Sequence, residues 1–290
     1  MTSPGPVPSS PLVALDTLWF QVAGTLCNLQ CTHCFISCSP ANHAHEMMSL
    51  GEVRRYLEEA EAIGVKEYYF TGGEPFLNRE ILEILEAALA LGPTSVLTNG
   101  VLIRPETAAR LRALSDASPY SLDVRISVDG MDAATNDAIR GDGTFERIVA
   151  GIRNLAAAGL NPVITVTEAC EGVALAEGRA RLLGRLRDLG LSRPRLKVMP
   201  LLRLGAETTR SRAYAEWESL VGRTLSPDEA EALQCSSCRM VTSRGVYVCP
   251  ILIDFPGARM AATLAEALRP FALSYRACFT CHEQGLSCRT

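Results

Sequence analysis

Short apolar runs typical of strands alternate with amphipathic helical runs through most of the chain, and this alternation constrains the fold more than any other feature. The six expected strands are Leu18–Val22, Glu67–Thr71, Ser95–Thr98, Leu122–Val128, Val163–Thr167 and Leu196–Met199. Strands that alternate with helices predict a parallel sheet with right-handed crossovers. Because six units fall short of the eight that close a complete barrel, we expect an α/β fold with an open, partial (six-unit) parallel β/α barrel.

The helical runs carry the start and stop signals of ordinary helices. The expected helices are Leu50–Ile63, Asn78–Leu91, one that starts at Pro105, Phe145–Ala158 and Ala174–Leu189. The first is preceded by Ser49 as a candidate N-cap and followed by Gly64 as a stop signal. Functional residues of such folds lie at the carboxyl ends of the strands, so motifs that directly follow the strands are the candidates for chemistry.

Three cysteines follow the first expected strand. Cys27, Cys31 and Cys34 are separated by three and then by two residues. Three thiolates this close together can bind three irons of one 4Fe–4S cluster, which leaves the fourth iron open to a substrate or cosubstrate. Cys38 could be a fourth ligand, but the gaps would then be three, two and three, unlike the two, two and three of bacterial ferredoxins.

A glycine-rich turn follows the second expected strand. Its residues are Gly72, Gly73, Glu74 and Pro75. Together with the three cysteines, this turn resembles the radical S-adenosylmethionine (SAM) enzymes, whose fold is also a partial barrel. The resemblance implies that the cysteines hold the cluster, that SAM chelates the fourth iron, and that the turn receives the SAM amino group, with a carboxylate meeting an ammonium. A zinc knuckle beside an unrelated turn is the alternative.

Later segments extend the resemblance to further contacts with SAM. The implied contacts are Asn99 after the third strand, Ser127 and Arg140 toward the carboxylate and ribose, and Met199 beside the adenine. Arg140 would grip the SAM carboxylate as a two-pronged fork. Many family members carry Asn after the fifth strand, where this chain has Thr167 and Glu168, so a ribose contact is not implied there.

A second group of cysteines occupies the C-terminal region. Two Cys-x-x-Cys pairs, Cys235/Cys238 and Cys278/Cys281, are the simplest four ligands of one auxiliary 4Fe–4S cluster. Cys249 and Cys288 would then be spare. An equally open interpretation makes Cys249 the fourth ligand and leaves Cys288 or Cys235 spare. A zinc ribbon is the plainer alternative, but the two pairs lie further apart than its usual 15–20 residues.

The segment between the first pair and Cys249 predicts a hairpin. The segment is Arg239–Val248, and its turn is expected near Ser243–Gly245. The region resembles the SPASM and twitch extensions that bind auxiliary clusters in radical SAM enzymes. We therefore expect a small iron–sulfur domain over residues 223–290, the barrel over residues 17–222, and a disordered tail rich in proline and serine over residues 1–16.

A narrower resemblance concerns the reaction. Gly245–Pro250 and the single set of auxiliary-cluster cysteines resemble the neomycin C epimerases of aminoglycoside biosynthesis. This implies a radical SAM epimerase, an isomerase that converts neomycin C to neomycin B at sugar carbon C-5‴. A 5′-deoxyadenosyl radical would take hydrogen from one face, and Cys249 would return hydrogen to the other. Glu168, Glu207 and Asp254 are the candidate carboxylates for the ammonium groups of such a substrate.

Three other functions fit the motifs. A radical SAM dehydrogenase of an amino-cyclitol needs no donor thiol, because the auxiliary cluster would accept the second electron. A radical SAM maturase of a ribosomal peptide is the second, although the segment before the first strand is too short for a peptide-binding domain. A zinc-bound scaffold or regulator is the third, from a different class.

Composition limits the partners. The chain has 290 residues with a net charge of −4, which gives no nucleic-acid footprint, and it lacks an apolar run long enough for a membrane span. Eleven cysteines without an export signal favour metal binding in a reducing cytoplasm over disulfides. The resemblance adds an external electron donor of the flavodoxin or ferredoxin type.

Overall fold

The computed structural model describes residues 5–285. Its strands are β1 Ser9–Ser10, β2 Thr17–Gln21, β3 Glu67–Thr71, β4 Thr94–Thr98, β5 Leu122–Ser127, β6 Val163–Thr167, β7 Arg195–Met199, β8 Cys238–Thr242, β9 Gly245–Tyr247, β10 Arg259–Ala261 and β11 Phe271–Ala272. Its α-helices are α1 Leu50–Ile63, α2 Ile81–Leu89, α3 Pro105–Ala117, α4 Ala133–Arg140, α5 Thr144–Ala157, α6 Ala176–Asp188, α7 Glu207–Arg210, α8 Pro227–Ala232 and α9 Ala277–Gln284. Short 3-10 helices are η1 Pro75–Leu77, η2 Gln234–Ser236, η3 Pro256–Ala258 and η4 Ala265–Ala267.

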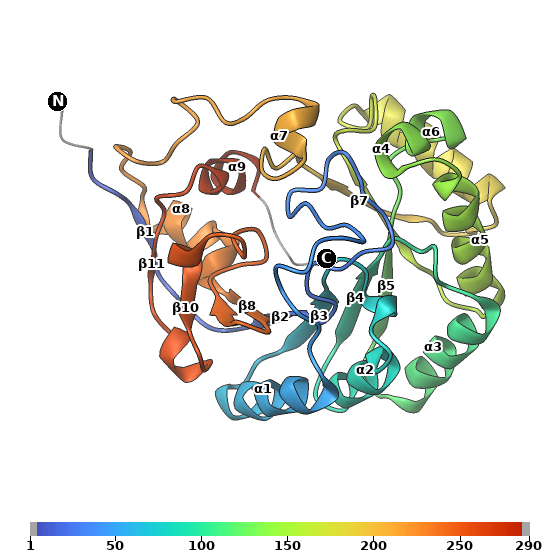
Figure 1. The fold of residues 1–290 in the computed structure, drawn as a ribbon, viewed down its shortest axis with the longest axis horizontal. Coiled ribbons are helices and arrows are strands. Elements are labelled where there is room, and N and C mark those ends of the chain that lie inside the picture. The colour runs from blue at the N-terminus through green and yellow to red at the C-terminus, as the bar shows by residue number, and fades with distance from the viewer. Residues whose placement is uncertain (1–4, 286–290) are drawn as a thin grey trace.

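One open sheet organises the described residues, in the order β10-β9-β8-β2-β3-β4-β5-β6-β7. Strands β2 to β7 are parallel, and the helices between them wrap around the outer face of the sheet (Figure 1). Phe20, Phe70 and Val96 are register partners on adjacent strands with no exposed surface, so this row anchors the core. The six expected strands are confirmed, and the sheet does not close into a barrel.

Helix boundaries follow local side-chain chemistry. The N-cap Ser49 and Glu52 form a capping box at the start of α1, and Gly64 ends the helix in the left-handed conformation, as predicted. Helix α2 begins three residues later than expected. Asn78 does not open it, because its side-chain amide donates to the carbonyls of Val22 (2.9 Å) and Met48 (2.8 Å) and ties the turn to the segment after β2.

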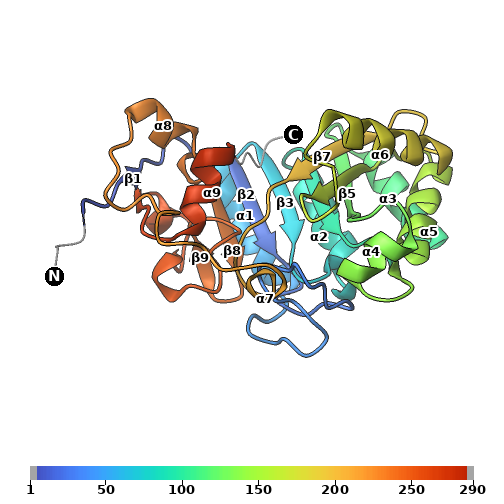
Figure 2. The same cartoon turned by 90° about the horizontal axis from the view of Figure 1, so that it is seen from above.

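The C-terminal hairpin extends the same sheet. Strands β8 and β9 form the predicted hairpin, but β8 also pairs in parallel with β2, with Cys238 opposite Thr17. Figure 2 shows this region, in orange and red, beside the blue strand β2. The region after residue 222 therefore continues the sheet beyond the six predicted strands, and all five residues of β8 are buried there.

The N-terminal segment is ordered over the part that the structure describes. Strand β1 pairs with β11, Ser10 and Leu15 are buried, and Val13 donates a backbone hydrogen bond to the carbonyl of Ser236. The expected disordered tail is therefore replaced, over most of its length, by a strap across the C-terminal region. Composition alone missed this, because the pairing partner lies far away in the sequence.

None of the helices in residues 5–285 is long and apolar enough to cross a membrane.

Candidate active site

The loop after β2 carries the first three cysteines, and each sulfur accepts an N–H. The Leu29 backbone N–H lies 3.4 Å from the Cys27 sulfur, and the side-chain amide of Asn99 lies 3.8 Å from it. Arg140 Nη1 lies 4.0 Å from the Cys31 sulfur, and the Cys38 backbone N–H lies 3.3 Å from the Cys34 sulfur. Hydrogen bonds to sulfur stabilise the thiolate form that binds iron.

These three thiols differ in acidity. Burial raises the pKa of Cys27 to about 12 and also raises the pKa of Cys31, against the charge of Arg140. The hydrogen bond with Cys38 instead holds the pKa of Cys34 below its usual range. A metal must therefore displace protons from Cys27 and Cys31 when it binds.

The glycine-rich turn is joined to the cysteine loop by its backbone. Gly73 donates to the carbonyl of Gly24 (2.8 Å) and Glu74 to that of Leu26 (3.0 Å). A Cβ on Gly73 would lie 2.0 Å from the Leu26 carbonyl oxygen, so only glycine fits there. Gly73 thus lets the turn approach the cysteine loop closely.

Glu74 is fully buried and its carboxylate is already engaged. One oxygen accepts from the Thr98 hydroxyl (2.7 Å) and the Phe76 N–H (3.1 Å), and the other accepts from the Asn99 N–H (2.8 Å). Burial raises the pKa of Glu74 to about 7, against these hydrogen bonds. The carboxylate thus fixes the turn and the end of β4, and its contact with the ammonium of SAM stays a prediction.

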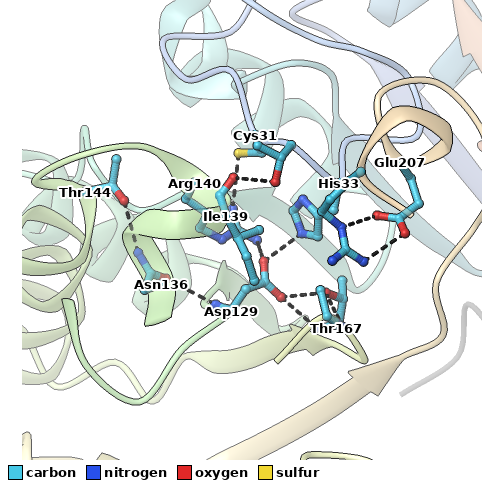
Figure 3. Close-up of polar contacts among 12 residues, drawn as sticks. Cys31, His33, Asp129, Asn136, Ile139, Arg140, Thr144, Thr167 and Glu207 are labelled. Carbon is cyan, nitrogen blue, oxygen red and sulfur yellow. Dashed lines mark hydrogen bonds and ion pairs between the residues drawn. The ribbon is translucent and has the colours of Figure 1, made fainter. Parts of the chain in front are cut away.

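A buried charged group centred on Asp129 lies beside the cysteine loop (Figure 3). Its carboxylate lies 2.7 Å from His33 Nε2 and 2.5 Å from Arg140 Nη2, and it accepts from the hydroxyl and N–H of Thr167. Burial alone would raise the pKa of Asp129, but Arg140, His33 and Thr167 together hold it well below its usual range. Arg140 therefore faces both an anion and the Cys31 sulfur.

A further pair of hydrogen bonds joins the cysteine loop to helix α4. Thr32 donates its N–H (2.8 Å) and its hydroxyl (3.3 Å) to the carbonyl of Ile139. The sequence analysis assigned no role to Asp129 or to His33. The signal that could have found them is an acidic residue at a strand end together with a histidine inside the cysteine motif.

The remaining predicted SAM contacts lie at the expected strand ends. Ser127 ends β5 and Met199 ends β7, and both are half-buried. Asn99 is buried after β4, and its side-chain amide donates to Asn28 (2.7 Å). Pro75 is buried at the start of η1. These residues surround one edge of the sheet, and their contact with SAM stays a prediction.

The C-terminal cysteines converge on one cavity. Its lining includes Cys235, Cys249, Cys278 and Cys281, with apolar side chains between them. Cys238 is buried beside them, with its sulfur 4.0 Å from the Val248 carbonyl oxygen. In residues 5–285 no three potential ligands converge closely enough to hold a single metal ion; the thiols surround a space. Cys288 lies outside the described residues.

The hairpin places Cys249 toward the start of β2. Strand β9 ends at Tyr247, which pairs with Met240, and Cys249 follows two residues later, in the direction of Cys238, which itself pairs with Thr17 at the start of β2. The first cysteine loop follows the other end of β2. The hairpin therefore extends the edge of the sheet.

The candidate pocket carboxylates have different environments. Glu207 is fully buried and bonded to Arg210 through both oxygens (2.7 and 2.8 Å), so it is not free to meet a substrate. Asp254 has a side chain 42% exposed and lies 3.7 Å from His45 Nε2. Glu168 is half-buried after β6. Asp254 and Glu168 stay candidates.

Comparison with known proteins identifies the family from a match over half of the chain. Residues 22–169 match the model of the Radical SAM superfamily. A mycofactocin maturase of Mycobacterium tuberculosis is 38% identical over 162 residues, which is 55% of this chain and 39% of that protein. An AdoMet-dependent heme synthase of Methanosarcina barkeri is 37% identical over 139 residues, 47% of this chain and 38% of that protein. The chain thus spans well under half the length of these relatives.

Solved structures show the same fold. SuiB of Streptococcus suis bound to S-adenosylmethionine gives a TM-score of 0.64 at 17% identity, covering 86% of this chain and 63% of that one. A peptide-bound anSMEcpe structure with AdoMet gives 0.62 at 18% identity, covering 87% and 79%. The family match spans half of the sequence and includes the cysteine loop, the glycine-rich turn and Asp129, so the chain belongs to the radical SAM superfamily.

Proposed function

We propose that this protein is a radical SAM epimerase of an aminoglycoside, which inverts one sugar carbon (C-5‴ of neomycin C, giving neomycin B). The observation that carries this proposal is the convergence of five cysteines in the C-terminal region: Cys235, Cys238, Cys249, Cys278 and Cys281. A cubane cluster takes four thiolates, so one thiol is left over. A leftover thiol beside a redox centre suits hydrogen-atom donation.

The first cysteine loop suits the SAM-binding cluster. Cys27, Cys31 and Cys34 supply three thiolates, each with an N–H donor. When bound, this cluster and SAM supply the radical that abstracts hydrogen from the substrate. The glycine-rich turn and Arg140 are the proposed contacts for the amino and carboxylate groups of SAM. Arg140 is pre-oriented for such a contact by Asp129.

We assign the donor thiol to Cys249. It is 6% exposed, and burial raises its pKa well above the usual value, so the sulfur keeps its hydrogen at neutral pH. Donation breaks the S–H bond, forms a C–H bond on the opposite face of the sugar, and leaves a thiyl radical. One electron and one proton restore the thiol, and an external flavodoxin- or ferredoxin-type reductant supplies the electron through the auxiliary cluster.

The position of Cys249 also supports the competing assignment. Cys249 lines the same cavity as Cys235, Cys278 and Cys281, which suits a cluster ligand, in which case another cysteine of the region is the spare one. Replacing each cysteine separately separates the roles: loss of a ligand lowers the iron content, whereas loss of the donor leaves iron and SAM cleavage intact.

A peptide maturase is the second candidate. It is favoured by the maturase among the relatives, 38% identical over 162 residues, and it shares the same SAM chemistry. The chain spans 39% of that relative, so the substrate-binding parts are not compared.

Solvent labelling tests the proposal. Reconstituted protein, SAM and a reductant are incubated with neomycin C in deuterated water. We expect neomycin B with one deuterium at the inverted carbon, because a thiol exchanges its proton with solvent. An aminoglycoside recovered unchanged while SAM is cleaved would contradict the epimerase, and modification of a precursor peptide under the same conditions would establish the maturase.

A further inference from the structure

Arg239 is a buried cation within the second cysteine region. It is the second residue of β8, directly after Cys238, and its side chain has no exposed surface, which makes it the largest fully buried residue in residues 5–285. An arginine is almost never fully buried unless it is paired. Its surroundings should therefore contain a partner for its charge.

Backbone carbonyls satisfy its hydrogen bonds. Nε donates to Ala267 (3.0 Å), Nη1 donates to Cys235 (2.7 Å) and Cys238 (2.6 Å), and Nη2 donates to Arg269 (2.7 Å). The guanidinium thus joins the first Cys-x-x-Cys pair to the segment around η4. Carbonyl dipoles accept hydrogen bonds but carry no net charge, so this cradle leaves the positive charge uncompensated.

No carboxylate in the described chain lies within ion-pair distance of Arg239. The contrast is Arg140, which is buried beside the first cysteine loop and pairs with Asp129. Leaving a buried charge unpaired is strongly unfavourable. The anions that could compensate Arg239 are the sulfurs of Cys238 and Cys235, whose charges act on its guanidinium, once a metal centre holds them as thiolates.

We propose that Arg239 is the built-in counter-charge of the thiolate-ligated cluster in the second cysteine region, and that it positions the Cys235–Cys238 pair for ligation. The inference rests on the auxiliary cluster of the proposed function. A 4Fe–4S cluster with thiolate ligands is anionic and becomes more so when an external reductant adds one electron. A nearby fixed cation stabilises the reduced state more than the oxidised state, so Arg239 raises the reduction potential.

The test uses the full chain with Cys27, Cys31 and Cys34 replaced by alanine, so that any remaining iron belongs to the second region. In this background Arg239→Gln removes the charge but keeps a hydrogen-bonding side chain. Arg269→Gln is the matched control, because Arg269 is an exposed cation of the adjoining segment and solvent screens its charge. The readouts are iron content and the midpoint potential from a spectroscopic titration.

We expect Arg239→Gln to lower the reduced-to-oxidised ratio at a fixed potential at least roughly tenfold, which is a negative shift of about 59 mV for one electron. Arg269→Gln should shift the midpoint potential much less. A merely structural role would change iron retention or folding without moving the potential. An unchanged potential in a folded, iron-loaded Arg239→Gln protein would overturn the inference.

A second variant covers the case in which Arg239→Gln does not fold. Leu268 is 41% exposed and lies between the two residues of the η4 segment whose carbonyls bind Arg239. Leu268→Glu adds a negative charge there without touching the cradle, and Leu268→Gln is its neutral control. We expect a negative shift of the midpoint potential in Leu268→Glu but not in Leu268→Gln. Equal midpoint potentials in the two variants would overturn the inference.

The two proposals fail differently. If the three-alanine background holds no iron, the auxiliary cluster of the proposed function is absent, and the role of Arg239 is refuted with it. If the background holds iron but neither Arg239→Gln nor Leu268→Glu moves the potential, the cluster stands and only the role of Arg239 is refuted.

Discussion

The two cysteine regions lie at opposite ends of β2, and the surroundings of their sulfur atoms differ. In the loop after β2, N–H groups point at all three sulfurs, and Cys31 and Cys34 are only half-buried. In the second region the sulfurs line an apolar cavity beside the single guanidinium of Arg239. The first arrangement suits an open cluster that receives a cosubstrate, and the second suits a closed cluster.

Thiol pKa values vary within the first region, whereas burial raises them in the second. Burial raises the pKa of Cys278 to about 12 and that of Cys235 to about 11, and it also raises the pKa of Cys249. In the first region burial likewise raises the pKa of Cys27 to about 12, whereas hydrogen bonding lowers the pKa of Cys34. Buried thiols of both regions therefore keep their protons unless a metal replaces them, and Cys249 meets the requirement that a hydrogen-atom donor be a thiol and not a thiolate.

The largest expected effect is in the first region. Replacing Cys27 with alanine leaves two ligands, and we expect SAM cleavage to fall to background, measured as 5′-deoxyadenosine. Iron held by the second region should remain, at about four atoms per chain. Undiminished 5′-deoxyadenosine production would show that this loop is not the SAM site and would refute the proposed difference between the two cysteine regions.

The next effect separates two cysteines of the same cavity. Cys249→Ala should still cleave SAM and retain its iron, yet give no epimer, because alanine has no transferable hydrogen. Cys281→Ala is the matched variant and should lose the second cluster. Both side chains line the cavity, so packing changes are comparable. Loss of iron in Cys249→Ala would make Cys249 a ligand and move the donor role to another cysteine.

Replacing Asp129 with asparagine tests what holds the first loop. We expect a loss of about 3–5 kcal/mol of folding free energy, because Arg140 is left buried without its partner, and a fall of about 10- to 100-fold in SAM cleavage. The folded-state pKa of Asp129 lies below its usual 3.8. The ionised carboxylate therefore stabilises the wild type above that pH, and the stability difference should shrink as the pH falls below it.

Denaturant titrations of both proteins at neutral and acidic pH measure this difference. A gap that stays constant down to the most acidic pH that the fold tolerates would show that the Asp129 charge is not what stabilises the loop. Ser127→Ala, at the end of the same strand β5, is the control, because it removes a half-buried hydroxyl from the same edge of the sheet without leaving a buried charge unpaired.

Local sequence patterns predicted the parallel strands and the ends of α1, but they did not predict which distant segments pair with one another. The strands of the partial barrel and the ends of α1 follow from apolar runs and caps such as Ser49 and Gly64. The pairing of β8 with β2 and of β1 with β11 joins segments far apart in sequence, which no local pattern encodes. The same holds for Asp129, whose partners His33 and Arg140 come from different elements. Contacts between side chains from distant elements could not be predicted from the sequence, because no local pattern records them.

The smallest predicted effect tests whether the N-terminal strap belongs to the second region. The buried hydroxyl of Ser10 donates to the Ala230 carbonyl (2.9 Å), and its hydrogen bond with Cys235 acts against the effect of burial on that thiol. We expect Ser10→Ala to cost about 1 kcal/mol, which lowers the melting temperature by about 2–4 °C. Iron should be lost faster from the second region than from the first. Ser9→Ala is the matched control, because Ser9 is exposed. Equal changes in melting temperature and in the rate of iron loss in the two variants would mean that the strap stabilises the chain without acting on the cysteines it covers.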